Sequence, residues 1–162
     1  MTPLEPPDSH HLMAAQGWLE LGNLLEANAE LEKIAPRFKA HPLVVIVRWD
    51  ICAKAEKWDD ALPWAESLMK LLPGEPQTWI NLSFTLHELD RTPEARDNLL
   101  PAVKKFPKHW TIPYNLACYE SQLGELGQAK KWLKRAFKIG GARRMRLLAL
   151  EDPDLQPLWG QI

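Results

Sequence analysis

Apolar residues recur along this chain with the spacing of a helix face and with a longer fixed period. Ala27, Leu31 and Ile34 stand at positions i, i+4 and i+7, which share one face of a helix. The same three positions recur three more times at intervals of 34 residues, as Ala61, Ala65 and Leu68; Ala95, Leu99 and Ala102; and Ala129, Leu133 and Ala136. A helical unit of this size cannot bury its apolar face alone, so the pattern predicts four copies that stack.

Each unit has a further helical segment ahead of this apolar set, so the chain is predicted to be all-α. A flexible, proline-rich N-terminus (1–8) precedes four units at about 8–41, 42–75, 76–109 and 110–141. The predicted helices are 9–21, 24–38, 43–55, 59–71, 76–88, 92–105, 110–123 and 126–139. Gly140 and Gly141 end the last of these, and residues 142–162 are predicted to form a capping helix and a tail.

Proline and tryptophan mark the places where the repeat is irregular. Pro36 and Pro101 fall inside predicted second helices, and each should kink or end its helix because proline lacks an amide donor. Trp49 occupies a slot that holds a small residue in the other units, namely Ala15, Ser83 and Ala117. Either the helix around Trp49 is rotated or it lies further from its neighbour.

The third unit resembles a known repeat signature. Its residues match the W-x2-L-G-x2-Y…A-x3-F…P spacing of tetratricopeptide repeats (TPR) at Trp79, Leu82, Ser83, Leu86, Ala95, Leu99, Ala102 and Pro107. The ending Asp152-Pro153-Asp154-Leu155, followed by Pro157 and Leu158, resembles the segment that closes many such arrays. The resemblance implies a right-handed α-solenoid of helix-turn-helix units with a C-terminal capping helix.

Composition and cysteine usage narrow the class of protein. Apolar residues make up 46% and charged residues 25% of the chain, as in folded soluble domains. No apolar run approaches the ~18 residues of a membrane span, and the first nine residues do not resemble a secretory signal. Cys52 and Cys118 are expected to be free thiols in a reducing compartment, which favours a cytoplasmic protein.

Opposite charges divide the two halves of the sequence. Residues 1–81 hold 7 basic and 12 acidic residues, a net charge of −5, whereas residues 82–162 hold 13 and 9, a net charge of +4. Head-to-tail self-association, helped by Trp159, is therefore an alternative function. Lys130, Lys134 and Lys138 form a basic row on one helix, for which a solvated outer face is the ordinary explanation. Nucleic acid is disfavoured, and an anionic partner of the basic half stays a minor alternative.

Candidate catalytic and metal-binding residues are sparse. Ser83, His87 and Asp90 have the residue types of a catalytic triad, but Ser83 belongs to the positions where paired helices cross. A serine held by helix packing is poorly placed to attack a substrate, so a catalytic triad is disfavoured. The adjacent His10 and His11 lack a third metal ligand. The two carboxylates of the closing motif, Asp152 and Asp154, are too few for a calcium loop and are expected to cap a turn or helix. The sequence predicts no enzyme, no metal and no cofactor.

The resemblance implies a ligand groove along the first helices of the units. The residues expected on that face are Leu12, Gln16, Ile46, Asp50, Ile80, Asn81, Phe84, His87, Tyr114, Asn115 and Cys118. Asn81 and Asn115, one repeat apart, either hold the backbone of a ligand or bridge adjacent repeats. The set contains no Lys or Arg that could clamp a C-terminal carboxylate, so an apolar or amphipathic segment is the expected ligand.

These observations favour a scaffold or adaptor that binds a protein partner without changing it covalently. A co-chaperone-like adaptor in the cytoplasm, holding a peptide or a helix in its groove, is the leading hypothesis. Self-assembly into a homo-oligomer is the alternative from a different class. Partner and pathway are not encoded in the repeat, because similar arrays serve unrelated ligands.

Overall fold

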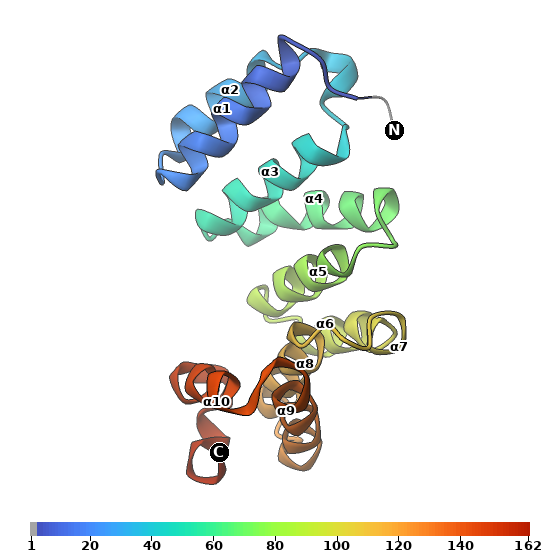
Figure 1. The fold of residues 1–162 in the computed structure, drawn as a ribbon, viewed down its shortest axis with the longest axis vertical. Coiled ribbons are helices and arrows are strands. Elements are labelled where there is room, and N and C mark those ends of the chain that lie inside the picture. Colours follow the sequence, from blue (N-terminus) through green and yellow to red (C-terminus); the bar gives the residue numbers. More distant parts are fainter. Residues whose placement is uncertain (1–2) are drawn as a thin grey trace. The chain divides into compact units, whose positions relative to one another are not determined.

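The computed structural model describes residues 3–162, which form ten α-helices, two 3-10 helices and no strand (Figure 1). Residues 1 and 2, part of the predicted flexible N-terminus, lie outside the described residues. The chain divides into two compact units, Met1–Pro73 and Gly74–Ile162, here called the N-terminal unit and the C-terminal unit. The division falls close to the predicted boundary between the second and third repeats.

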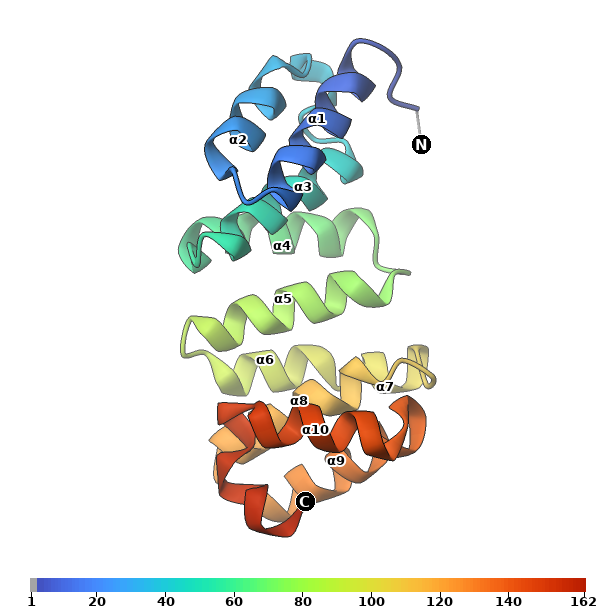
Figure 2. The ribbon, with the colours of Figure 1, turned by 60° about the vertical axis from the view of Figure 1, so that its left-hand side comes forward.

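Each unit contains two helix-turn-helix pairs. The N-terminal unit holds α1 (Asp8–Glu20) with α2 (Leu24–Lys33), and α3 (Pro42–Lys54) with α4 (Trp58–Leu71). The C-terminal unit holds α5 (Pro76–Glu88) with α6 (Thr92–Leu99) and the short α7 (Ala102–Lys105), and α8 (Thr111–Gln122) with α9 (Leu126–Gly140). These pairs can be followed in Figures 1 and 2. The apolar columns of the 34-residue repeat are buried in all four pairs, as predicted.

Two predicted helices end earlier than expected. The helix predicted over 24–38 ends at Lys33, and Pro36–Phe38 forms a separate 3-10 helix (η1). The helix predicted over 92–105 is interrupted between Leu99 and Ala102, where Pro101 stands. Proline can occupy the first turn of a helix but removes a backbone hydrogen bond further along. Pro36 and Pro101 therefore each begin a new helical segment, although the apolar pattern continues past them.

The irregular second repeat keeps the packing of its neighbours. Trp49 is buried, as are Ala15, Ser83 and Ala117 at the same position of the other repeats, so α3 is not rotated. Arg48 is half-buried, and its guanidinium donates to Glu32 Oε1 (2.7 Å) and lies 5.3 Å from the centre of the Trp64 ring. The large indole is therefore accommodated without a change in helix phase.

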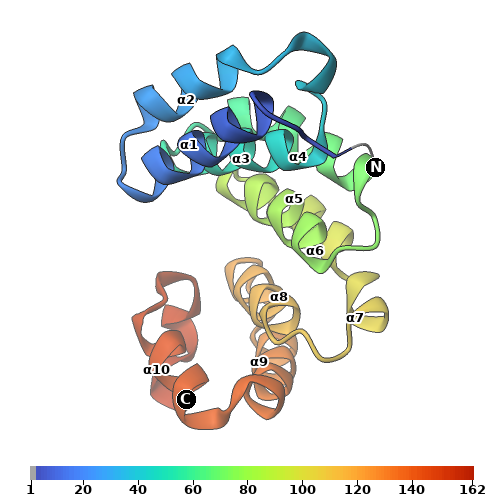
Figure 3. The ribbon, with the colours of Figure 1, turned by 45° about the horizontal axis from the view of Figure 1, so that its top comes forward.

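The C-terminal unit is closed by α10 (Ala142–Glu151) and the 3-10 helix η2 (Pro153–Gln161), which lie against α8 and α9 (Figure 3). A side chain at Gly140 would place its Cβ 2.8 Å from Met145 Sδ and 3.1 Å from Trp110 Cγ. Glycine is therefore required where α9 ends, because the start of α8 and the buried Met145 of α10 approach the backbone closely. The predicted capping helix is thus present and tightly packed.

Candidate functional site

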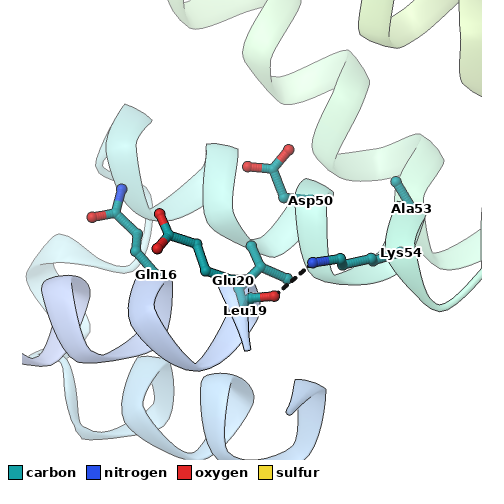
Figure 4. A pocket seen from close by; sticks show the side chains of 6 residues that line it. All are labelled: Gln16, Leu19, Glu20, Asp50, Ala53 and Lys54. Carbon is teal, nitrogen blue, oxygen red and sulfur yellow. Dashed lines mark hydrogen bonds between the residues drawn. The ribbon is translucent and has the colours of Figure 1, made fainter. Parts of the chain in front are cut away.

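The N-terminal unit contains an open cavity between α1 and α3. Its volume is about 600 Å³, and Figure 4 shows the side chains that line it: Gln16, Leu19, Glu20, Asp50, Ala53 and Lys54. Gln16 and Asp50 belong to the predicted groove, and they lie one repeat apart. A volume of this size is typical of sites that hold a small molecule or a side chain of a partner.

The other predicted groove residues of this unit lie deeper. Leu12 belongs to the hydrophobic core, together with Ala15 and Val44, and is not open to a ligand. Ile46 is half-buried on α3, one turn before Asp50. The prediction of Leu12 as a groove residue is corrected by the packing of α1, which turns this leucine toward the interior.

Acidic and basic side chains meet in the cavity without pairing. Lys54 Nζ donates to the backbone oxygen of Leu19 at 2.7 Å, which ties this amine to the end of α1 (Figure 4). Asp50 is half-buried, and burial raises the pKa of its carboxyl, an effect that the charge of Lys54 partly offsets. Glu20 is exposed at the edge of the cavity. Glu20 and Lys54 were not among the predicted groove residues, although each stands four residues after one of them.

The same face of the C-terminal unit is covered by the end of the chain. The tail, defined as residues 152–162, lies against α8 and contacts three predicted groove residues. The Tyr114 hydroxyl donates to Asp152 Oδ2 at 2.8 Å, and Cys118 Sγ lies 3.6 Å from the same oxygen. His87 Nε2 lies 2.9 Å from Asp154 Oδ2. The structure therefore brings these residues together around the tail of their own chain.

Further contacts hold the tail in place. Gln122 Nε2 donates to the backbone oxygen of Asp154 (3.1 Å), and Asp152 Oδ1 accepts from the Asp154 amide (3.1 Å). The second bond caps the start of η2, the role expected for Asp152. Leu155 and Leu158 are buried, and the Trp159 indole donates to the backbone oxygen of Ala149 (2.9 Å). Polar and apolar groups thus anchor the tail together.

The electrostatics of this network favour protonated donors around two carboxylates. Burial raises the pKa of Tyr114, and the bond to Asp152 adds to the effect. Burial and the two aspartates raise the pKa of the Cys118 thiol well above its usual range, so the thiol stays protonated at neutral pH. Burial lowers the pKa of His87, but the hydrogen bond and the negative charge of Asp154 outweigh it and leave the pKa raised.

Metal-ligating atoms of Cys118, Asp152 and Asp154 lie within 4.8 Å of one another. Each of them already takes part in the hydrogen bonds that hold the tail, and a protonated thiol is a poor metal ligand. The cluster is therefore explained by its structural contacts.

The remaining predicted groove residues lie on α5 and α8. Ile80 and Asn81 are buried, and Phe84 and Asn115 are half-buried. Gln77 Nε2 donates to Asn81 Oδ1 at 2.7 Å, so this amide oxygen is engaged within its own helix. That bond neither holds the backbone of a ligand nor bridges adjacent repeats, the two roles considered for Asn81.

The residues of the imagined triad do not face one another. Ser83 Oγ accepts a hydrogen bond from Asn98 Nδ2 at 2.7 Å. The two ring nitrogens of His87 contact Thr92 Oγ1 and Asp154 Oδ2, both at 2.9 Å. His87 is therefore committed to the tail and to α6, and the Ser83 hydroxyl is committed to Asn98. Among the described residues, no helix is long and apolar enough to cross a membrane.

Comparison with known proteins identifies the fold. No model of a known protein family matches the chain, and no curated protein matches it in sequence. MamA from Desulfovibrio magneticus RS-1 superimposes with a TM-score of 0.76 at 12% identity, over 83% of this chain and 76% of that one. MamA from MSR-1 gives 0.71 at 20% identity, over 82% and 76%. YrrB, described as a TPR protein with an unusual peptide-binding site, gives 0.75 at 17% identity, over 90% and 75%.

MamA and YrrB are both TPR proteins. The chain therefore has the all-α solenoid fold of tetratricopeptide repeats, as the resemblance of its third unit implied. At these identities the similarity concerns the fold.

Proposed function

We propose that the protein is a non-catalytic scaffold that binds a peptide or a helix of a partner protein. The observation that carries this proposal is the open cavity between α1 and α3, which lies on the face where the ligand groove was predicted. The fold supports it in general terms, because stacked helix pairs present an extended surface and serve mainly in binding. The peptide-binding site named for YrrB supports the same kind of ligand.

The chemistry of the cavity suits an amphipathic segment. Leu19 and Ala53 provide apolar surface, whereas Gln16, Glu20 and Asp50 provide hydrogen-bonding groups. An amphipathic helix laid on such a face buries apolar side chains and places one polar side chain in the cavity. The register-equivalent face of the C-terminal unit is occupied by the tail, so the N-terminal unit offers the available site.

A peptide-display selection against the whole protein tests the proposal. Selected peptides should bind the wild type and should lose about tenfold or more in affinity to a Gln16→Ala, Asp50→Ala variant, because a hydrogen bond to a charged group contributes about 1.5–3 kcal/mol. The matched control is Asp59→Ala, Asp60→Ala, which removes two exposed carboxylates of α4. Equal affinity for wild type and the Gln16, Asp50 variant would remove the cavity from the binding site.

Head-to-tail self-association is the second candidate. The acidic and basic halves motivate it, and Leu21 and Leu25 near the α1–α2 turn are each 78% exposed. Trp159, however, already uses its indole N–H within its own chain. Light scattering at low and high salt distinguishes the candidates, since contacts between exposed charges weaken as salt screens them. A constant monomeric mass at all concentrations excludes self-association.

The cysteines and the basic row of α9 bear on the compartment and on other partners. Cys52 and Cys118 are free thiols in the structure, which supports the proposed cytoplasmic location. Lys130, Lys134 and Lys138 are exposed on α9 and are accessible to an anionic partner. Binding of such a partner stays a minor alternative, because a row of exposed lysines is also the ordinary solvated face of a helix.

A further inference from the structure

Asp50 differs from the other non-exposed carboxylates of the N-terminal unit. Asp8 accepts a hydrogen bond from the Ala35 amide at 2.7 Å, and Glu30 contacts His11 and Lys33 at 2.8 and 2.6 Å. Asp50 is half-buried, yet among the described residues its carboxylate takes part in no hydrogen bond and no ion pair. A partly desolvated charge without a partner is costly, and a cationic ligand group would remove that cost.

The nearest cation does not fill this role. Lys54 stands one turn after Asp50 on α3, but its amine is bound to the Leu19 carbonyl at the end of α1. Figure 4 shows the Asp50 carboxylate directed away from this amine. Glu20 adds a second carboxylate and Gln16 an amide on the facing helix. The polar groups of the cavity therefore offer mainly hydrogen-bond acceptors.

The C-terminal unit shows how the same register positions hold a chain segment. Cys118 stands at the register of Gln16 and Asp50, His87 at the register of Leu19 and Ala53, and Gln122 at the register of Glu20 and Lys54. These three residues hold the acidic tail, with His87 against the Asp154 carboxylate. This face of the repeat thus binds a segment of the same molecule through hydrogen bonds to its carboxylates and backbone.

We infer that the cavity between α1 and α3 binds a basic side chain, arginine or lysine, from the partner segment. The inference rests on the proposed function and specifies its ligand. The aliphatic stem of the side chain would lie on Leu19 and Ala53, and its cationic head would donate to the Asp50 carboxylate, with Glu20 and Gln16 as further acceptors. Arginine is favoured over lysine, because a planar guanidinium donates to several acceptors at once and is less strongly hydrated.

The acidic first half of the sequence agrees with a basic partner. The first 81 residues carry a net charge of −5, which would attract a positively charged segment and raise its association rate. A divalent cation is a poorer match, because two carboxylates and one amide are too few ligands for calcium.

Small amino-acid derivatives provide a direct test by NMR on the whole protein. N-acetyl-arginine methylamide and its lysine counterpart, titrated to millimolar concentrations, should shift the amide signals of Gln16, Asp50 and Ala53. N-acetyl-citrulline methylamide has nearly the same shape as the arginine probe but no charge, and it should leave these signals in place. Shifts of equal size with citrulline, or no shift with either cationic probe, would overturn the inference.

Two variants complete the test. Asp50→Asn keeps the size of the side chain and should weaken the arginine probe by about tenfold or more. Asp60→Asn, on the exposed surface of α4, should leave its affinity unchanged. Undiminished binding to Asp50→Asn, in a protein whose other signals are unperturbed, would contradict the assignment.

Failure of this inference can be told from failure of the proposed function. The selected peptides would be tested with each Arg replaced by citrulline and each Lys by glutamine. If these peptides keep their affinity for the wild type but still lose it for the Gln16, Asp50 variant, the scaffold function stands and the basic side chain is rejected.

Discussion

The N-terminal and C-terminal units are built from the same repeat, but the equivalent face is open in the first and covered by the tail in the second. In the N-terminal unit, Gln16 and Asp50 border an open cavity. In the C-terminal unit, Cys118 stands at the same register but is buried against Asp152 of the tail. The helices that position these residues are equivalent, so the difference arises from the tail that succeeds the last repeat. A repeat position thus defines where a side chain points, and the neighbouring segment determines whether it is free to bind.

The comparison also shows two ways of handling charge. The C-terminal unit pairs each carboxylate of the tail with a donor, namely Tyr114, Cys118 or His87. Among the residues that the structure describes, Asp50 of the N-terminal unit has no such donor. A buried carboxylate that loses its donor destabilises a fold, whereas a half-buried carboxylate that has no donor is a candidate for a ligand site. Four predictions, ordered by size, test this contrast.

The largest effect is expected when the apolar anchor of the tail is shortened. Leu155 is fully buried, so Leu155→Ala should lower the free energy of unfolding by about 2–5 kcal/mol, through lost burial and the cavity left behind. Urea denaturation followed by circular dichroism measures the change. Leu147→Ala is the control, since Leu147 is 59% exposed and should cost little. Amide exchange should increase in α8 and stay unchanged in α1; a uniform increase in both units would contradict the contrast.

A smaller effect is expected from the polar anchor. Asp152 accepts from the Tyr114 hydroxyl, the Cys118 thiol and the Asp154 amide. Asp152→Ala should cost about 1.5–3 kcal/mol, because buried donors lose a charged acceptor. It should also speed alkylation of Cys118, which the tail now shields. Mass spectrometry after a brief iodoacetamide pulse resolves this thiol from Cys52. Glu151→Ala serves as control, and an unchanged rate at Cys118 would show that the tail does not protect it.

A pH effect of less than about 1 kcal/mol is expected from His87, since the ion pair is partly exposed to solvent and screened. Its pKa is raised in the folded protein, where Asp154, Glu88 and Asp152 act on it. The protonated ring therefore stabilises the unit fully below the unfolded pKa of about 6.5, and this contribution is lost as pH rises through the folded pKa. The difference in unfolding free energy between wild type and His87→Gln should shrink from about pH 6 to about pH 9. A constant difference would exclude a charged pair.

The smallest effect on stability is expected at Asp50. Asp50→Asn should leave the unfolding free energy unchanged or raise it by up to about 0.5 kcal/mol, because among the described residues the carboxylate makes no bond that could be lost and the neutral amide is less costly to bury. Asp152→Asn, measured in the same way, should cost more. A large loss at Asp50 would indicate a structural carboxylate and would weaken its assignment to a binding site.

Much of the fold could be predicted from the sequence. Most helix limits follow from the repeat of apolar positions, because the same positions recur in four copies and each copy indicates where the corresponding helices begin and end. The helix limits differ at Pro36 and Pro101, the two prolines that were expected to kink or end their helices, because the apolar pattern continues past them. The face that carries Gln16 and Asp50 was also predictable, since helical spacing decides which residues point the same way.

The role of each face could not be predicted in the same manner. His87 and Asp154 are 67 residues apart, and no local pattern links them. Asp152 was expected to cap a turn, which it does, but its second oxygen binds Tyr114 from another helix. Leu12 has the spacing of a groove residue and still turns into the core.

The sequence by itself determined the repeat, the helices and the register of the inner face, because these depend on spacing along one segment. Only the tertiary structure decided that the tail covers this face in the C-terminal unit, while Asp50 of the N-terminal unit has no hydrogen-bond partner in residues 3–162. The physical reason is that docking of the tail depends on the combined burial of Leu155 and Leu158 and on hydrogen bonds between distant residues. Such contacts arise only when the helices have assembled.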